Sequence, residues 1–391
     1  MKIEAVDFFY LALPEIRDIG DGSQDALLVR VAADGLVGWG ECEASPLVTM
    51  AAWNCPMSHS ACKPVSASVL GQEVCDPSDI RRIHTQVRAN CLDLLQADHT
   101  LSGIDTALWD LLGKKLSEPV YRLLRFERAY PKTAYASVLF GETPQATLEK
   151  ARAARRSGFR AVKFGWGPFG HGSVEDDAHQ LEAAREGLGG EGVLLVDAGA
   201  VWDDDVERAR QRFPALLAAR ATWLEEPFVH SAMGAYRELA GDSGGIKLAG
   251  GEGCHSYHQA KNMVDYAKLS FMQIDAGRVG GITAAKQAAD YAHSHGVQFV
   301  NHTFTSHLAL SASIQPFAGY ESDDLCEYPF DPSSIASVFH CQALEPDREG
   351  YVRLPEAPGL GVSPNLDLIR NYLKEVEIRV GELTLFRSSK L

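Results

Sequence analysis

The sequence predicts an α/β protein in which a closed barrel of parallel strands follows a smaller α+β domain. From about residue 133 onward, short apolar runs alternate with longer polar stretches of helical character. The alternation contains eight apolar runs, and eight strands each followed by a helix are the number that closes a barrel. About the first 125 residues follow a different pattern, which indicates a separate domain.

The N-terminal region combines strand and helix patterns. Apolar runs interrupted by glycines at residues 26–32 and 35–41 predict a β-hairpin or meander. Residues 102–114 place apolar side chains at i, i+3 and i+4, which is the spacing of one helix face. Together these patterns predict an α+β domain.

The barrel prediction depends on how regularly the alternation repeats. Polar stretches separate nearly all of the apolar runs, and those at 143–157, 203–219 and 282–294 are typical of helices, which predicts parallel βαβ units. An open doubly wound sheet is the alternative, but no Gly-x-Gly-x-x-Gly sequence opens a helix after a predicted strand. The segment from Tyr351 onward falls outside the alternation, and we expect it to pack against the first domain. The eight runs are residues 133–139, 161–166, 193–198, 222–227, 246–252, 270–276, 297–302 and 325–328.

Composition and charge narrow the class of protein. The chain is 46% apolar and 23% charged, which is ordinary for a globular protein, and no apolar run reaches the length of about 18 residues that a membrane span needs. The start, Met1 to Val6, carries an acidic residue and does not resemble a signal peptide, so we expect a cytoplasmic protein. Eight cysteines without a Cys-x-x-Cys pair predict free thiols. A formal charge of −15 argues against nucleic acid or an anionic membrane as partner.

Three acidic residues lie at the carboxyl ends of consecutive predicted strands. Asp197, Glu225 and Glu252 are separated by about one β/α unit each. Reactive side chains of β/α barrels come from these strand ends, so the three carboxylates should share one mouth. Each acid taken alone is more often a solvated loop residue. Together and unpaired they would repel one another, and a hard divalent cation relieves that repulsion, which favours magnesium over zinc in an all-oxygen site.

A histidine and a further acid occupy the next two strand ends. Asp275 and His302 are again about one unit apart. A neighbouring carboxylate can hold the imidazole tautomer and stabilise its protonated form, as a general base requires. The alternative is that His302 is a structural histidine at the top of the barrel without a chemical role.

Six short motifs are spread over nearly the whole chain: Gly-Ile-Asp-Thr-Ala-Leu-Trp-Asp at 103–110, Asp-Ala-x-x-x-Trp at 197–202, Glu-Glu-Pro at 225–227, Ala-Gly-Gly-Glu at 249–252, Arg-Val-Gly-Gly-Ile-Thr at 278–283 and the Pro-Gly-Leu-Gly of the tail. Together they resemble the mandelate racemase and muconate lactonizing enzyme branch of the enolase superfamily. The resemblance implies a (β/α)7β barrel under an N-terminal α+β cap, with one magnesium ion per chain on Asp197, Glu225 and Glu252. It also implies that the metal holds the substrate carboxylate while an enediolate forms. We expect a cap at residues 1–128, the barrel at 129–355 and a segment at 356–391 that packs back on the cap.

Two positions depart from the family pattern. The second strand often carries Lys-x-Lys, whose second lysine is a base opposite the histidine, and here Lys163 matches the first lysine while Gly165 stands in place of the second. One face of the substrate therefore lacks its base, although Lys163 can still neutralise charge. Gly199 stands where the family usually has the asparagine of Asp-Ala-Asn, so a contact in or near the substrate site must differ.

The resemblance and its departures together predict a dehydratase of acid sugars, similar to the rhamnonate-dehydratase-like subgroup. His302 would take the α-proton and could also return it to the leaving β-hydroxyl, and Glu327 resembles the acid that hydrogen-bonds the substrate carboxylate opposite the metal. The product would be a 2-keto-3-deoxy acid. The alternatives are a racemase, epimerase or cycloisomerase with Lys163 as second base, and a catalytically inactive metal-binding barrel. We expect a small-molecule carboxylate as substrate, a homo-oligomer, and specificity set by cap loops such as 53–65.

Overall fold

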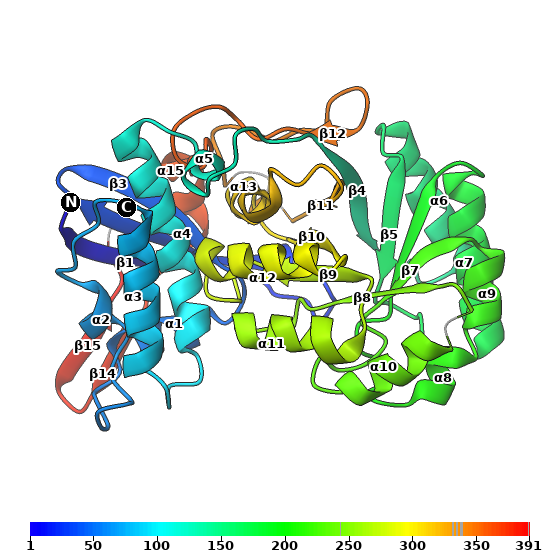
Figure 1. The fold of residues 1–391 in the computed structure, drawn as a ribbon, viewed down its shortest axis with the longest axis horizontal. Helices are drawn as coiled ribbons and strands as arrows, with labels where there is room; N and C mark the ends of the chain where they lie inside the picture. The colour runs from blue at the N-terminus through cyan, green and yellow to red at the C-terminus, as the bar shows by residue number, and fades with distance from the viewer. Residues whose placement is uncertain (243, 331, 334, 337–338, 390) are drawn as a thin grey trace.

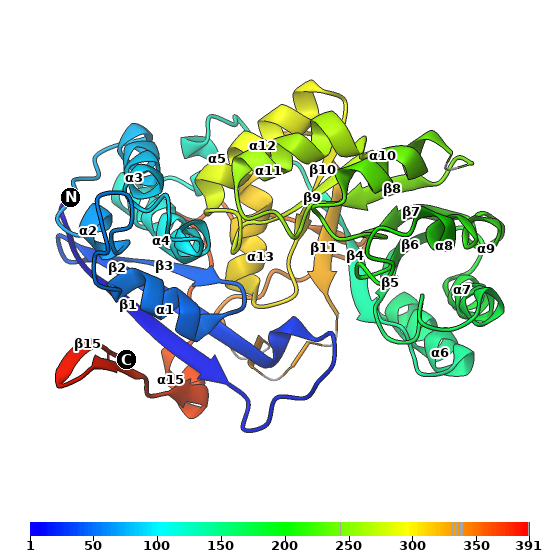
Figure 2. The same cartoon turned by 90° about the horizontal axis from the view of Figure 1, so that it is seen from below.

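The computed structural model describes residues 1–391 apart from 243, 331, 334, 337, 338 and 390. Figure 1 shows an N-terminal cap built on an antiparallel sheet beside a barrel of parallel strands. The two-part α/β architecture that the sequence predicts is therefore confirmed. Figure 2 shows the C-terminal segment returning to the cap.

The cap is organised by three strands and one long helix. Strands β1 (Ile3–Ala12), β2 (Asp25–Ala33) and β3 (Leu36–Cys42) pair as an antiparallel meander, and the predicted hairpin forms β2 and β3. Helix α4 (Ala97–Leu116) contains the predicted helical stretch and packs on this sheet. The contact is backbone to backbone, because a Cβ atom built on Gly40 would lie 2.1 Å from the carbonyl oxygen of Gly103. The remaining cap helices are α1 (Pro46–Asn54), α2 (Ser66–Val69), α3 (Pro77–Asn90) and α5 (Val120–Leu123).

The barrel strands follow the predicted apolar runs. They pair in parallel in the order β10-β9-β8-β7-β6-β5-β4-β11. This order runs along the sequence from β4 to β10, as expected for successive βαβ units, and rules out a doubly wound sheet. The strands are β4 (Lys132–Leu139), β5 (Ala161–Gly165), β6 (Val193–Asp197), β7 (Ala221–Glu225), β8 (Lys247–Gly250), β9 (Phe271–Asp275), β10 (Gln298–His302) and β11 (Leu325–Pro329).

A side chain bridges the seam between β10 and β11. The Asn301 side-chain amide donates to the carbonyl oxygen of Glu327 at 3.2 Å, and its side-chain oxygen accepts from the backbone N–H of Glu327 at 3.0 Å. In the described residues β10 and β11 form no backbone ladder with each other, and the side chain of Asn301 supplies hydrogen bonds to the backbone of β11 at this seam.

The helices that connect the strands agree with two of the three predicted stretches. The stretches at 143–157 and 282–294 form α6 (Pro144–Arg156) and α12 (Ile282–Ser294). The stretch at 203–219 forms two short helices, α8 (Val206–Arg210) and α9 (Phe213–Ala218), because Pro214 cannot donate a hydrogen bond inside a continuous helix but fits the first turn of a new one. The other connecting helices are α7 (Val174–Leu188), α10 (Met233–Gly241), α11 (Tyr257–Asn262) and α13 (His307–Ile314).

Apolar side chains fill the barrel interior below the site. They come from seven consecutive strands, and they exclude a pore through the barrel. Polar side chains at the carboxyl ends of the strands therefore face a closed floor. The interior cluster consists of Tyr135, Ala161, Leu195, Trp223, Ala249, Phe271 and Val300.

The C-terminal segment leaves the barrel and joins the cap. Strand β12 (Tyr351–Val352) pairs antiparallel with β4, and β13 (Leu373–Lys374) pairs antiparallel with β1 of the cap. Between them lies helix α15 (Leu366–Ile369), and beyond them β14 (Glu377–Val380) and β15 (Leu383–Arg387) form a hairpin. The tail thus contacts both parts of the protein (Figure 2).

Two further observations concern the whole described chain. All eight cysteines are free, as expected. In the residues that the structure describes, no helix combines the length and apolar character needed to cross a membrane.

Candidate active site

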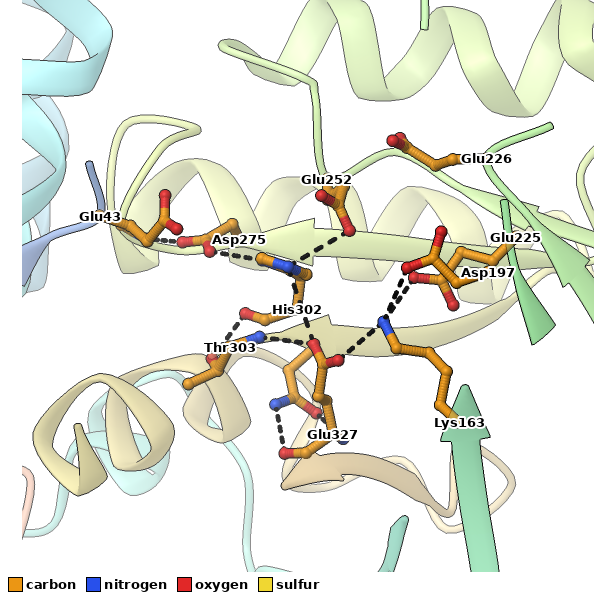
Figure 3. Close-up of polar contacts among 12 residues, drawn as sticks. Glu43, Lys163, Asp197, Glu225, Glu226, Glu252, Asp275, His302, Thr303 and Glu327 are labelled. Atoms are coloured by element: carbon orange, nitrogen blue, oxygen red, sulfur yellow. Dashed lines mark hydrogen bonds and ion pairs between the residues drawn. The ribbon is translucent and has the colours of Figure 1, made fainter. Parts of the chain in front are cut away.

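A cavity of about 1060 Å³ opens at the carboxyl ends of the barrel strands. The barrel and the cap both line it. The predicted residues Glu225 and Asp275 are buried beside it, where they contact side chains that line the cavity (Figure 3). The predicted site residues that line it are Lys163, Asp197, Glu252, His302 and Glu327.

The cap side of the cavity differs from expectation. Residues 18–22 together with Glu43 and Ala44 line it, and none of residues 53–65 does so. The loop at 53–65 packs instead against the turn between α3 and α4, where Lys63 N–H donates to Asn90 and Asp93 N–H donates to Ala61. Residues 18–22, rather than the loop at 53–65, are therefore the cap segment placed to contact a molecule in this cavity.

Strand register places the acidic residues. Asp197 pairs with Glu225 across β6 and β7, so their side chains emerge at the same level. Glu252 lies two residues beyond the end of β8. Gly251 makes this turn possible, because its φ is +120° and a Cβ atom there would lie 2.7 Å from the carbonyl oxygen of Gln273.

Lys163 lies among three of the predicted acids. Its Nζ atom is 2.6 Å from Glu225 Oε1, 2.8 Å from Glu327 Oε1 and 3.7 Å from Asp197 Oδ2 (Figure 3). Burial opposes the charge of this ammonium group, but Glu225 and Glu327 outweigh it and hold the pKa of Lys163 well above its usual value. Lys163 is thus a buried cation that balances neighbouring carboxylates.

Two buried acids of the site were not predicted, Glu226 and the cavity-lining Glu43. Glu226 follows Glu225 in the Glu-Glu-Pro motif, is buried, and has a φ of +37°. Burial and the charge of Glu252 raise the pKa of Glu226 to about 8. Burial also raises the pKa of Asp197 to about 6 against the opposing effect of Lys163. The two successive glutamates of the Glu-Glu-Pro motif were a signal for Glu226. Successive side chains of a strand ordinarily point to opposite sides, however, so the sequence alone placed only Glu225 at the site.

His302 and Asp275 are neighbours, as their spacing predicted. Nδ1 of His302 lies 2.7 Å from Asp275 Oδ2, so the carboxylate favours a proton on Nδ1. Nε2 of His302 lies 3.2 Å from Glu252 Oε2 and 4.0 Å from Glu327 Oε2. Burial would lower the pKa of His302, but Glu252 and Glu327 raise it to about 10. Asp275 is held in turn by the N–H of Gly277, which donates to Oδ1 at 2.6 Å.

Glu327 closes the side of the site formed by β11. Its Oε2 atom accepts the backbone N–H of Thr303 at 2.8 Å (Figure 3). Burial would raise the pKa of Glu327, but Lys163 and His302 lower it. Glu327 is therefore a hydrogen-bond acceptor in this arrangement, whereas the resemblance implies a donor. The difference arises because two cationic groups face the same carboxylate.

The two glycines that depart from the family pattern have steric causes. A Cβ atom on Gly165 would lie 2.6 Å from Asp197 Oδ2, so a side chain there would displace this carboxylate. Gly199 has a φ of +56°, and its N–H donates to Asp197 Oδ1 at 2.8 Å. The indole of Trp166 packs on both Gly199 and the cap residue Gly20, at 3.1 and 3.0 Å from their built Cβ positions.

Asp197, Glu225 and Glu252 have the chemistry of a divalent-cation site, but in this structure each of them pairs with a cationic side chain. Among the described residues, no three His, Cys, Asp or Glu side chains converge closely enough to hold an ion. Asp197 and Glu225 face Lys163, and Glu252 faces His302. These three acids nevertheless supply only oxygen ligands from consecutive strands, and the pKa of Asp197 is raised by burial. That donor set suits magnesium.

Comparisons with known proteins cover most of the chain. Residues 20–125 match the mandelate racemase / muconate lactonizing enzyme N-terminal domain, and residues 146–368 match the enolase C-terminal domain-like family. A crystal structure described as a predicted mandelate racemase from Rhodobacter sphaeroides is 56% identical, with a TM-score of 0.95 and 100% of both chains covered.

Two curated relatives differ in the reaction that their names describe. D-galactarolactone cycloisomerase of Agrobacterium fabrum is 28% identical over 364 residues, which is 88% of this chain and 90% of the relative. L-talarate/galactarate dehydratase of Salmonella typhimurium is 29% identical over 264 residues, which is 65% of this chain and 63% of the relative. Similar chains therefore include both isomerases and dehydratases.

Proposed function

Because this chain belongs to the mandelate racemase and muconate lactonizing enzyme branch of the enolase superfamily, we propose that it is a dehydratase of acid sugars. One observation carries the choice of reaction. His302, paired with Asp275, faces the cavity from β10, while position 165 on β5 cannot hold a side chain without displacing Asp197. A racemase that works by deprotonation needs a base on each face of the carbon, whereas a dehydratase can use one.

In the proposed reaction, the imidazole of His302 acts twice. Its Nε2 atom takes the proton from the carbon next to the substrate carboxylate, and the electron pair of that C–H bond passes toward the carboxylate. The bond from the next carbon to its hydroxyl then breaks, and the imidazolium returns the proton so that water leaves. The remaining enol becomes a 2-keto-3-deoxy acid by tautomerisation. Atoms and charges balance without an oxidant or reductant.

The neighbours of His302 would support both steps. Asp275 accepts from Nδ1 and stabilises the imidazolium while the proton is held. Lys163 and Glu327 form an ion pair at 2.8 Å, and Glu327 lies 4.0 Å from His302, so the ammonium group of Lys163 would lie near the substrate carboxylate. A magnesium ion held by Asp197, Glu225 and Glu252 would supply the positive charge that stabilises negative charge developing on that carboxylate.

An isomerase is the second candidate, because the cycloisomerase relative matches 88% of this chain. In an isomerase that exchanges protons on both faces, Lys163 would be the second base. Its Nζ atom is paired with Glu225 and Glu327, and those acids favour the charged form of Lys163, as Glu252 and Glu327 favour the charged form of His302. The choice of the dehydratase therefore rests on Gly165, which leaves β5 without the family's second base.

A substrate panel tests the proposal. The magnesium-loaded protein is incubated with aldonates and aldarates, and formation of 2-keto-3-deoxy acids is measured together with proton exchange in D₂O. We expect a dehydration product from at least one aldonate or aldarate. It should be lost in His302→Asn but kept in the control His179→Asn, which changes an exposed side chain of α7. Epimerised or cyclised products would favour the isomerase, and absence of any exchange would favour an inactive barrel.

A further inference from the structure

Arg278 links three acidic residues at the junction between cap and barrel. It lies on the turn after β9, three residues beyond Asp275, and it lines the active-site cavity. Its guanidinium faces Glu43 of the cap, Glu252 of the barrel and Asp275. The proposed reaction assigns no role to Arg278 or to Glu43.

The three contacts of Arg278 are unequal. Glu43 is bound by two parallel contacts, since Nε contacts Oε2 and Nη2 donates to Oε1 at 2.8 Å. This two-point geometry is the strongest that an arginine forms with a carboxylate. Glu252 receives only longer contacts from Nη1, at 3.5 Å to Oε1 and 3.4 Å to its backbone oxygen. Nε lies 4.0 Å from Asp275 Oδ2.

Glu43 is held in place by the docking of the cap. It follows the end of β3, and its N–H donates to Gly277 of the barrel at 3.2 Å. Its carbonyl oxygen contacts the imidazole of His99 on α4. The side chain is buried, with an exposed fraction of 7%. Burial would raise the pKa of Glu43, but Arg278 lowers it to about 2, so the pair is ionic.

The carboxylate of Glu252 lies between His302 and Arg278 and is also a proposed metal ligand. Its Oε2 atom lies 3.2 Å from His302 Nε2, and Oε1 lies 3.5 Å from Arg278. If Arg278 lost Glu43, the nearest carboxylate within its reach would be Glu252. A two-point pair there would occupy both oxygens of Glu252 and place a fixed positive charge beside any bound cation.

We propose that Glu43 is a positioning residue that holds Arg278 away from Glu252, so that docking of the cap keeps Glu252 available to a metal ion. This inference rests on the magnesium site of the proposed function, but not on which reaction follows. It makes the cap a part of the metal site although the cap supplies none of the three proposed ligands.

A double-mutant cycle on magnesium affinity tests the inference. Calorimetric titration of metal-free protein with Mg²⁺ is compared for the wild type, Glu43→Gln, Arg278→Gln and the double variant. We expect Glu43→Gln to weaken binding by roughly 10- to 100-fold, as supporting residues of metal sites do. In the Arg278→Gln background the same change should have less than about a threefold effect, because no guanidinium remains to capture Glu252.

The cycle separates this role from simple electrostatics and from structural support. Loss of one negative charge by itself would weaken Mg²⁺ binding equally in both backgrounds, and that result would overturn the inference. Glu43→Asp keeps the charge but shortens the side chain, so it should weaken binding only when Arg278 is present, and it replaces Glu43→Gln if that variant fails to fold. Asp7→Asn, which breaks the remote Asp7–Arg30 pair of the cap, is the matched control.

The same titration distinguishes the two proposals. If the wild type binds no Mg²⁺, the metal assignment fails and the inference fails with it. If the wild type binds Mg²⁺ and Glu43→Gln binds it equally well, only the inference fails.

Discussion

Replacement of Gly165 by alanine tests the steric argument on which the choice of reaction depends. A Cβ atom at this position would lie 2.6 Å from Asp197 Oδ2 and 3.0 Å from Asp197 Cβ and Cγ. Ordinary contact begins near 3.4 Å, so the carboxylate must move by about 0.8 Å. The backbone at Gly165 is part of β5 and is not left-handed, so the methyl group itself is the whole perturbation.

The size of the effect follows from this displacement. Forcing a methyl group into a packed site costs about 1–3 kcal/mol of unfolding free energy, partly offset by about 0.4–1 kcal/mol from the lower entropy of the unfolded chain. A shift of about 1 Å in a positioned group can cost about 100-fold in rate. We therefore expect Gly165→Ala to lose roughly 10- to 100-fold in turnover and to bind Mg²⁺ more weakly, with only modest loss of stability.

The assay combines three measurements on one variant and its control. Turnover, calorimetric Mg²⁺ affinity and urea unfolding are compared for Gly165→Ala and Gly234→Ala. Gly234 lies in α10, and a Cβ atom there meets nothing within 4 Å, so this control should be neutral or stabilised by up to about 1 kcal/mol. Wild-type Mg²⁺ affinity and turnover in Gly165→Ala would refute the reasoning, and the missing second base would need another explanation.

Three further outcomes are expected. His302→Asn should still bind Mg²⁺ but lose roughly 10²–10⁴-fold in steady-state turnover, and normal turnover of this variant would place the base elsewhere. Asp275→Asn should lose less turnover, because the imidazole is misoriented but still present. In D₂O, NMR should show α-proton exchange for only one of two α-epimers, and exchange of both would implicate Lys163. Burial raises the pKa of Asp105 to about 7 from an ordinary value near 3.8, so the folded state binds this proton more tightly than the unfolded state. Asp105 therefore contributes its full stabilisation below about pH 4, and this contribution is lost as the pH rises through 7. The unfolding free energy measured in urea should fall over this pH range, and the fall should be smaller in Asp105→Asn.

The sequence alone determined the architecture and the chemical character of the site. Alternating apolar and polar runs placed eight strands correctly, because each βαβ unit repeats one local pattern. The sequence also indicated which residues stand at the ends of strands. Parallel strands of a barrel bring their carboxyl ends to one side, so those residues meet there whatever the details of packing. Asp275 and His302 are adjacent for this reason, since β9 and β10 pair in register.

The tertiary structure alone decided what those side chains contact. Pairing of Glu252 with His302, capture of Arg278 by Glu43 and closure of the seam by Asn301 each join residues far apart in the chain. The same holds for the cap, where residues 18–22 rather than 53–65 reach the cavity. Local periodicity carries no information about such contacts, because they depend on how two separately patterned domains dock and on which charged groups burial forces into pairs.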